Sequence, residues 1–337
     1  MIVDIVIGLQ HGDEGKGKVT HHLLKSAEYT HCVRFNGGCN AGHTIYHNGK
    51  KFVTHHIPAG VFFGVKSIIG NGCVVDPIKF HKELNMLEEN GIEASKLVKI
   101  AKNAHVIRSS YLEEDSNDKT IGTTKTGNGP AYREKYNRTG TRVEEVDSLQ
   151  PFLIDIYEEL HSDSGNVILM EGAQGFWLDP DWGDYPYVTS SHTGVAAAIQ
   201  NAINPRSIRN IWGVIKAYET YVGKRPFQPN DPIFDKIQMA GSEFGATTGR
   251  VRQCNWLNPS EIKQAIKMNG VNRLVVNKVD VLREVDSWGI VGDTFGNERD
   301  FRLFMQSQFN REIGIDSIYF SDNPRSIYEE NRLTTGG

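Results

Sequence analysis

The chain of 337 residues contains 23% charged and 39% hydrophobic residues, which is ordinary for a water-soluble globular protein. Its formal net charge of −4 argues against a nucleic-acid partner, because non-specific binding of nucleic acid needs a basic surface. No apolar run approaches the length of a membrane span, and the N-terminus lacks the pattern of a signal peptide, so we expect no membrane partner.

Short runs rich in Val and Ile recur along the chain, and such runs are typical of strands buried on both faces of a sheet. They span residues 2–8, 67–70, 97–101, 167–170, 210–215, 273–276 and 316–320. Helical patterns lie between them, at residues 77–90, 148–161, 260–269 and 298–311. This alternation predicts an α/β fold with a mostly parallel central sheet covered by helices, like that of P-loop NTPases.

We find no convincing linker and expect a single domain over residues 1–337. Three polar segments are long enough to be functional loops, at residues 34–60, 115–143 and 216–256. No Cys-x-x-Cys spacing occurs among the four cysteines, which favours a reducing, cytoplasmic compartment over a zinc site.

The first predicted strand runs directly into the glycine-rich segment 12–18 (GDEGKGK). Glycines let consecutive backbone N–H groups surround an anion, and the lysines add positive charge. A helix predicted to begin near Lys18 would point its positive end at the same anion. The spacing matches most of a phosphate-binding P-loop, but Val19 stands where Ser or Thr would hold magnesium. A bound nucleotide therefore needs another metal ligand, for which Asp13 is the candidate.

Two further segments can bind phosphate. Residues 40–44 (NAGHT) offer backbone groups and the imidazole of His43. Residues 121–130 (IGTTKTGNGP) supply backbone N–H groups and threonine hydroxyls, which bind anions without a fixed charge. We interpret this second segment as a separate phosphate site because four cations follow it, namely Arg133, Lys135, Arg138 and Arg142.

Later segments supply an amide, a hydroxyl and two arginines. In the EGAQG segment, which follows a predicted strand, the amide of Gln174 can pair with a purine edge. Thr189, in YPYVTSS, can reach a phosphate. In FGATTGRVR, Arg250 and Arg252 can bind two different anions, such as a carboxylate and a phosphate.

The strand run at 273–276 leads into Asn277-Lys278-Val279-Asp280. The terminal carboxylate can accept hydrogen bonds from guanine N1–H and the 2-amino group, which adenine cannot supply, while the lysine stem covers the ring. This motif and segment 12–18 together favour a GTP site. The other segments predict a second nucleotide and a small carboxylate. The alternative from another functional class is a regulatory GTP-binding switch, which would need only segment 12–18 and residues 277–280.

In this order, the segments resemble the adenylosuccinate synthetase family. That family carries GDEGKGK, NAGHT, IGTT followed by GPAY, EGAQG, YPYVTSS, FGATTGR and a Lys-x-Asp guanine motif, all of which occur here. The chain is compact, like the shorter members. The resemblance implies a carbon–nitrogen ligase of purine biosynthesis. GTP phosphorylates O6 of IMP, and the amine of L-aspartate then displaces that phosphate to give adenylosuccinate, GDP and phosphate.

The resemblance also implies roles for single residues. Asp13 matches the base that takes the N1 proton of IMP, and together with the carbonyl of Gly42 it matches the ligands of Mg²⁺. His43 matches the donor to the transferring phosphoryl group, and Lys16 a phosphate contact. The resemblance implies four catalytic residues, which are Asp13, Lys16, His43 and Gln174.

The remaining matches are binding residues. The IMP contacts are Asn40, Thr124, Arg138, Gln174, Thr189 and Val222. The aspartate contacts are Thr247, Thr248 and Arg250. The GTP contacts are Gly12, Glu14, Gly15, Lys16, Gly17, Lys18, Gly42, His43, Thr44, Arg252, Lys278 and Asp280. Because Arg138 matches an arginine that reaches the IMP of the neighbouring subunit, a homodimer is implied.

The chain departs from the family pattern near the ribose. His11 replaces the usual Trp beside Asp13, and residues 221–225 (YVGKR), which include Val222, replace the usual RVGAG. A related phage branch makes a similar bond to dGMP, and its typical members lack the base aspartate. Asp13 therefore favours IMP, whereas the altered ribose side keeps dGMP as an alternative. The expected location is the cytoplasm, or the host cytoplasm if the chain is viral.

Overall fold

The computed structural model describes residues 1–26, 28–118, 121–245, 249–323 and 326–329. Its α-helices are α1 (Lys16–Leu24), α2 (Pro77–Glu89), α3 (Ala94–Leu97), α4 (Ser109–Ser116), α5 (Asn128–Asn137), α6 (Ile156–His161), α7 (Val195–Ile199), α8 (Pro232–Ala240), α9 (Pro259–Asn269), α10 (Val279–Glu284) and α11 (Glu298–Gln308). Its 3-10 helices are η1 (Ala59–Phe63), η2 (Val143–Glu145), η3 (Asp147–Phe152), η4 (Phe176–Leu178), η5 (Pro205–Ser207) and η6 (Arg311–Ile313).

The strands of the main sheet are β1 (Ile2–Gly8), β2 (His31–Arg34), β5 (Lys66–Ile69), β7 (Val98–Ala101), β9 (Leu153–Ile154), β10 (Val167–Glu171), β11 (Ile208–Lys216), β14 (Arg273–Asn277), β17 (Ser317–Phe320) and β18 (Tyr328–Glu329). Smaller pairings join β3 (His43–His47) to β4 (Lys50–Thr54), β6 (Val74–Val75) to β8 (His105–Val106), β12 (Tyr218–Tyr221) to β13 (Gln253–Trp256), and β15 (Trp288–Ile290) to β16 (Asp293–Phe295).

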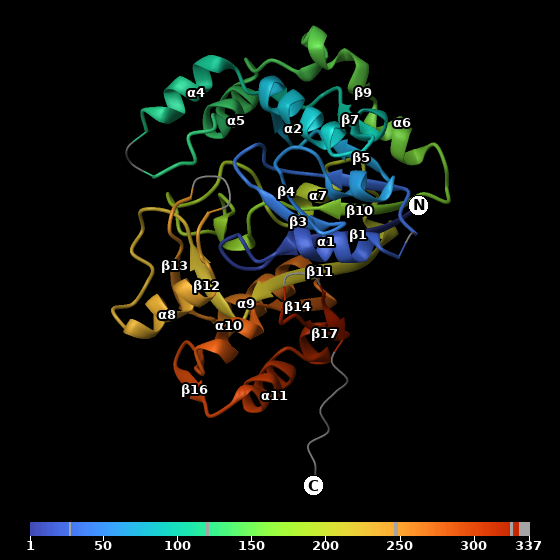
Figure 1. Ribbon diagram of the computed structural model, residues 1–337. Helices are drawn as coiled ribbons and strands as arrows, with labels where there is room; N and C mark the ends of the chain where they lie inside the picture. The colour runs from blue at the N-terminus through green and yellow to red at the C-terminus, as the bar shows by residue number, and fades with distance from the viewer. Residues whose placement is uncertain (27, 119–120, 246–248, 324–325, 330–337) are drawn as a thin grey trace.

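The main sheet has the order β18-β17-β14-β11-β1-β10-β2-β5-β7-β9. Neighbouring strands pair in parallel, except β17 with β18, which pair antiparallel. Figure 1 shows this order from β7 and β9 near the top to β17 near the bottom, with β12, β13 and α8 at the left. The predicted α/β fold with a mostly parallel sheet is confirmed.

The parallel register brings the polar ends of several strands to one edge of the sheet. Glu171 at the end of β10 lies opposite Val6 of β1 and Arg34 of β2. On the other side of β1, Lys216 of β11 lies opposite Asn277 of β14. The segments that follow these strands therefore leave from the same edge, where ligand sites of such sheets lie.

The sheet separates two hydrophobic cores. Along β1, Val3, Ile5 and Ile7 belong to one core, and Val6 belongs to the other. Leu169 of β10 packs with Val6 in the second core, while its neighbours on the strand face the first. Side chains alternate between the faces of a strand, so a run that is apolar at every position is buried on both sides.

Two predicted helices begin at clear capping residues. The side chain of Asp76 accepts hydrogen bonds from the first turn of α2, and Asn258 does the same for α9. Pro77 and Pro259 follow these caps at the start of each helix, where the missing N–H costs nothing.

The helix predicted over 148–161 is wrong. Residues 147–152 form the 3-10 helix η3, which contains Pro151, and β9 follows before α6 begins. Proline disrupts the interior of an α-helix, and Asp155 caps α6 as a separate helix by accepting from Tyr157 N at 3.0 Å.

The strand β2, which lies inside the main sheet, was also not predicted from the sequence. Only Cys32 and Val33 are apolar in this short strand, so its pattern is weak. Its polar ends are buried with partners: His31 Nε2 lies 3.1 Å from Glu159 Oε1, and Arg34 Nη1 donates to Glu171 Oε1 at 2.9 Å. The three long polar segments likewise hold elements of their own, among them β3, β4, α5, β12, α8 and β13.

Buried histidines should make the fold sensitive to mild acid. Burial lowers the pKa of His56 to about 3, and those of His21 and His43 to about 4. Below the unfolded value of about 6.5, the unfolded chain takes up a proton that folded His56 refuses, so the free energy of unfolding falls by about 1.4 kcal/mol per pH unit for this residue. The carboxyl of Glu83, whose pKa burial raises to about 7, offsets part of this loss.

We therefore expect His56→Gln to unfold with a weaker pH dependence than the wild type between pH 6.5 and pH 4.5. Urea unfolding at intervals across this range checks the slope. Equal slopes for the two proteins would contradict a neutral, buried His56.

Candidate active site

The loop after β1 is turned by residues in the left-handed region, namely Gly12 (φ 89°), Asp13 (φ 59°) and Gly15 (φ 96°). The helix α1 begins at Lys16, earlier than the predicted start near Lys18. Glu14 is buried beneath the loop, where its Oε1 accepts from Gly12 N at 2.9 Å and its Oε2 pairs with Lys16. The side chain of Glu14 thus stabilises the loop. The GTP contact predicted for Glu14 would therefore come from its backbone.

This loop touches both halves of the sheet edge. A Cβ atom on Gly12 would lie 3.9 Å from Gln174 Cα, in the EGAQG segment. A Cβ atom on Gly15 would lie 2.8 Å from Asn277 Nδ2, which donates to the carbonyl of Glu14 at 2.7 Å. The two clusters predicted for different nucleotides therefore flank one loop.

Asp13 is exposed on the loop and pairs with Arg252. Arg252 Nε donates to Asp13 Oδ2 at 2.7 Å, and Arg252 Nη1 donates to Glu243 Oε2 at 2.7 Å. The structure thus joins two predicted residues that are 239 positions apart in the sequence, and it adds a third, Glu243, that was not predicted.

His43 lies on β3 against two buried charges at the sheet edge. Its Nδ1 is 2.6 Å from Glu171 Oε1, and the same oxygen accepts from Arg34 Nη1 at 2.9 Å. Burial, supported by Arg34, lowers the pKa of His43 to about 4. Burial alone would raise the pKa of Glu171, but His43 and Arg34 outweigh it and lower that pKa to about 2.

These charges fix the tautomer of His43. An ionised carboxylate only accepts hydrogen bonds, so Nδ1 of the neutral ring carries the proton that faces Glu171. Arg34 Nη1 lies 2.9 Å from Nδ1 and 3.2 Å from Nε2, and with the proton on Nδ1 only Nε2 can accept from it. The donor role predicted for His43 therefore requires the protonated ring. A Cβ atom on Gly17 would lie 3.1 Å from His43 Cβ, so α1 packs directly against this residue.

The predicted nucleotide contacts Asn40 and Gln174 lie together. Asn40 Oδ1 accepts from Gln174 Nε2 at 3.2 Å and from Asn128 Nδ2 at 2.7 Å. Gln174 Oε1 is buried and has no hydrogen-bond partner among the described residues. A buried acceptor without a partner is costly, so a ligand that donates to it would be bound favourably.

The other predicted contacts lie on separate segments and have other partners or partial exposure. Thr124 Oγ1 lies 2.8 Å from Thr126 Oγ1, and Arg250 Nη1 donates to the carbonyl of Gly122 at 2.7 Å. Thr189 and Val222 are half-buried, and Arg138 is exposed at the end of α5. The predicted aspartate contacts Thr247 and Thr248 lie outside the described residues.

The predicted guanine contacts gather at the far side of the loop. Lys18 Nζ donates to Ser321 Oγ at 2.6 Å. Burial lowers the pKa of Lys18 to about 8, and the neighbouring charges of Asp280 and Lys278 act on it in opposite directions. Lys278 Nζ donates to the carbonyl of Gly241 at 2.8 Å, and Asp280 is half-buried in the first turn of α10.

Three charged residues at the ends of strands belong to the site but were not predicted from the sequence. A buried strand ends at each of Arg34, Lys216 and Glu171. In the sequence-based prediction, Glu171 appeared only as part of the EGAQG segment. A single charge that closes an apolar strand was the available signal, because burial of a charge requires a partner.

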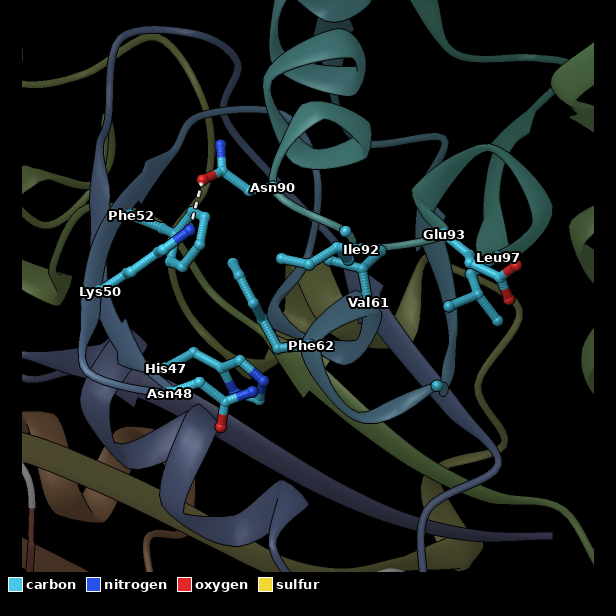
Figure 2. A pocket seen from close by; sticks show the side chains of 12 residues that line it. His47, Asn48, Lys50, Phe52, Val61, Phe62, Asn90, Ile92, Glu93 and Leu97 are labelled. Carbon is cyan, nitrogen blue, oxygen red and sulfur yellow. Dashed lines mark hydrogen bonds between the residues drawn. The ribbon is translucent and has the colours of Figure 1, made fainter.

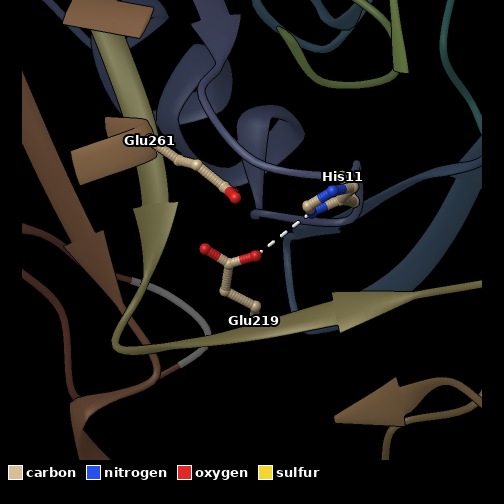
Figure 3. Close-up of side chains that lie close together, drawn as sticks. All are labelled: His11, Glu219 and Glu261. Carbon is tan, nitrogen blue, oxygen red and sulfur yellow. Dashed lines mark ion pairs between the residues drawn. The ribbon is translucent and has the colours of Figure 1, made fainter. Parts of the chain in front are cut away.

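Histidine and carboxylates also meet outside these clusters, as Figure 3 shows for His11, Glu219 and Glu261. Arg225 Nη2 lies 3.2 Å from His11 Nε2, so this nitrogen accepts and the ring proton is on Nδ1, 3.1 Å from Glu219 Oε2. His11 and Arg225, two departures from the family pattern, contact each other here.

The other such group, Asp179, Asp181 and His192, is organised by backbone contacts. Asp179 accepts from Asp181 N at 3.0 Å and from Thr193 N at 2.8 Å. We interpret this group as the support of its loop. The four cysteines are buried free thiols and belong to neither group.

A cavity of about 310 Å³ lies away from all of these clusters. Figure 2 shows it between the β3–β4 hairpin, η1 and the segment that follows α2, with Phe52, Val61, Phe62 and Leu97 among its lining residues. Of the predicted site residues that the structure describes, none lines it.

The sequence profile described as adenylosuccinate synthetase matches residues 5–152 and 144–294 of the chain. The chain belongs to the adenylosuccinate synthetase family. The adenylosuccinate synthetase of Thermodesulfovibrio yellowstonii is 37% identical over 97% of this chain and 86% of its own length. That of Parabacteroides distasonis is 38% identical over 85% of this chain and 80% of its own length. Members of this family are carbon–nitrogen ligases, so the alternative of a regulatory GTP-binding switch is not supported.

Solved structures of similar fold agree with this membership. The fully ligated adenylosuccinate synthetase of Plasmodium falciparum has a TM-score of 0.81 at 25% identity and covers 98% of this chain and 100% of its own. The succinoaminodeoxyadenylate synthetase PurZ of cyanophage S-2L, bound to dGMP and to dATP as an energy donor, has a TM-score of 0.78 at 20% identity. It covers 97% of this chain and 95% of its own, and it shares the fold.

No helix within the described residues has the length and apolar character needed to cross a membrane.

Proposed function

We propose that this enzyme joins L-aspartate to C6 of IMP at the expense of GTP. One observation carries the proposal: the loop that holds Asp13 lies next to Gln174 on one side and is hydrogen-bonded to Asn277 on the other. A purine nucleotide held near Gln174 and a guanine nucleotide held near Asp280 would thus meet at Asp13. Residues 1–337 act as one domain in this proposal.

The first step transfers a phosphoryl group. Asp13 accepts the N1 proton of IMP, the electrons shift to O6, and O6 attacks the γ-phosphorus of GTP, which releases GDP. The Lys16, Arg252 and His43 side chains stabilise the charge on the transferring group. The negative charge of that group raises the pKa of His43, which favours the protonated ring that this donor role requires.

In the second step, the amine of aspartate attacks C6, the C6–O6 bond breaks, and phosphate leaves with O6. The nitrogen loses a proton to give the neutral secondary amine. Arg250, with Thr247 and Thr248, binds the aspartate carboxylates, while Asn40, Thr124, Gln174, Thr189 and Val222 hold IMP.

Mg²⁺ suits the oxygen donors available at the loop, since it prefers carboxylate and carbonyl oxygens. The exposed carboxylate of Asp13 and the carbonyl of Gly42 would hold it, and bound Mg²⁺ would offset the charge of the GTP phosphates. Arg252 now pairs with Asp13, so the guanidinium shares or yields this carboxylate when the metal binds.

Isotope transfer tests the reaction directly. IMP labelled with ¹⁸O at O6 is incubated with GTP, Mg²⁺ and L-aspartate, and the released phosphate is analysed by mass spectrometry. We expect one ¹⁸O atom in the phosphate, because O6 leaves with the phosphoryl group. Unlabelled phosphate would show that the GTP is hydrolysed by water.

The second candidate substrate is dGMP. His11 and Arg225 both differ from the family pattern, and they contact each other and the ring of Tyr221, which precedes the predicted ribose contact Val222 in the chain. The proximity of these two departures favours an altered sugar preference. Asp13 favours IMP, and we therefore rank dGMP second.

We further propose a cytoplasmic homodimer in which Arg138 binds the IMP phosphate of the partner subunit. The exposed position of Arg138 at the end of α5 suits such a role.

Mixing two inactive variants tests the shared site. Arg138→Ala and Asp13→Asn are each expected to be inactive, but a mixed dimer would contain one site with both residues intact. Random exchange of subunits should restore about a quarter of the wild-type activity, because half of the dimers are mixed and each has one complete site. Measurement of phosphate release after exchange checks this, and no recovery despite proven exchange would contradict the role of Arg138 in the partner's site.

A further inference from the structure

A buried ion pair lies directly behind the Asp13–Arg252 contact. Lys216 Nζ donates to both carboxylate oxygens of Glu243, at 2.9 Å each. Tyr218 Oη donates to Glu243 Oε1 at 2.6 Å, and Arg252 Nη1 donates to Glu243 Oε2 at 2.7 Å. Lys216 is 2% exposed and Glu243 0%, so both charges are removed from water.

Glu243 remains ionised in this setting. Burial alone would raise its pKa, but Lys216 and Arg252 outweigh burial and lower that pKa to about 2. A buried carboxylate is tolerated when each of its oxygens has hydrogen-bond donors, and here both do.

The backbone at Arg252 is fixed by the same region. Arg252 N donates to the carbonyl of Glu243 at 2.9 Å, and Gln238 Nε2 donates to the carbonyl of Arg252 at 2.7 Å. The backbone of Arg252 is therefore fixed, its Nη1 is held by the buried carboxylate of Glu243, and its Nε donates to Asp13.

We propose that Glu243, supported by Lys216, is a positioning residue that fixes the Arg252 guanidinium beside Asp13 for binding the GTP phosphates. This inference rests on the proposed function, in which Arg252 binds GTP. A guanidinium that is fixed before the substrate binds loses less conformational entropy on reaching the transition state. Glu243 itself needs no contact with substrate.

A set of three variants separates positioning from stability. Glu243→Gln removes the charge and leaves Lys216 buried without a counter-ion, so this variant is expected to be unstable. Glu243→Gln combined with Lys216→Met removes both charges, so its stability should recover. Lys216→Met alone keeps Glu243 with its donors Arg252 and Tyr218, so Arg252 still has its carboxylate partner, and this variant is the matched control.

We expect the double variant to melt close to Lys216→Met, while its kcat/KM for GTP falls about tenfold below that control, with KM for IMP changed less. The affinity for GTP, measured by calorimetry without turnover, should fall in parallel. Equal kcat/KM and equal GTP affinity in the double variant and Lys216→Met would overturn the proposal. Failure of the proposed function would be seen separately, as absence of ligation by the wild-type enzyme.

Discussion

Replacement of Asp13 by Asn should abolish ligation while leaving the fold intact. Loss of the general base is expected to lower kcat about a thousandfold, because Asn cannot accept the N1 proton of IMP. The melting temperature should stay within about 3 °C of the wild type, since Asp13 is exposed, Arg252 keeps its pair with Glu243, and an ion pair with an exposed partner contributes only about 0–1 kcal/mol. Affinity for IMP should change little.

Steady-state phosphate release and calorimetric titration with IMP measure these quantities. Asp293→Asn, an exposed aspartate on β16, is the matched control and should behave like the wild type. Turnover by Asp13→Asn at the rate of this control would exclude Asp13 as the base.

Replacement of Asp280 by Asn should change which nucleoside triphosphate the enzyme uses. Two guanine donors would face the wild-type carboxylate, whereas Asn turns a donor toward the 2-amino group. We expect kcat/KM for GTP to fall about a hundredfold or more, because buried polar groups are then left unpaired. Xanthosine triphosphate has a carbonyl at position 2, so its relative use should rise.

Competition assays with GTP, ATP and xanthosine triphosphate measure this preference. KM for IMP and for aspartate is the internal control, because Asp280 lies on the guanine side of the loop, next to Lys18. An unchanged order of preference among the three triphosphates would refute the guanine assignment.

The sequence was sufficient for the fold class and for the grouping of the polar segments. Apolar runs such as Ile2–Gly8 are buried on both faces, so hydrophobicity alone located them. The parallel sheet then required the segments after β1, β10 and β14 to meet at one edge, and the position of Gly12 next to Gln174 and the hydrogen bond from Asn277 to Glu14 agree with this.

The misses have local physical reasons. The strand β2 has only two apolar residues, and the partners of its polar ends, Glu159 and Glu171, are distant in sequence. Pro151 divides the region predicted as one helix. Glu243 follows α8, and only the fold brings it to Lys216 and Arg252. Long-range ion pairs leave no periodic pattern in a single sequence.

A comparison of four nucleotides in parallel tests the proposed reaction. Phosphate release from GTP is measured with Mg²⁺ and L-aspartate in the presence of IMP, dIMP, GMP or dGMP, and the products are identified by mass. We predict aspartate-dependent phosphate release with IMP and formation of adenylosuccinate. Turnover with dGMP but not with IMP, or phosphate release that does not depend on aspartate, would contradict this prediction.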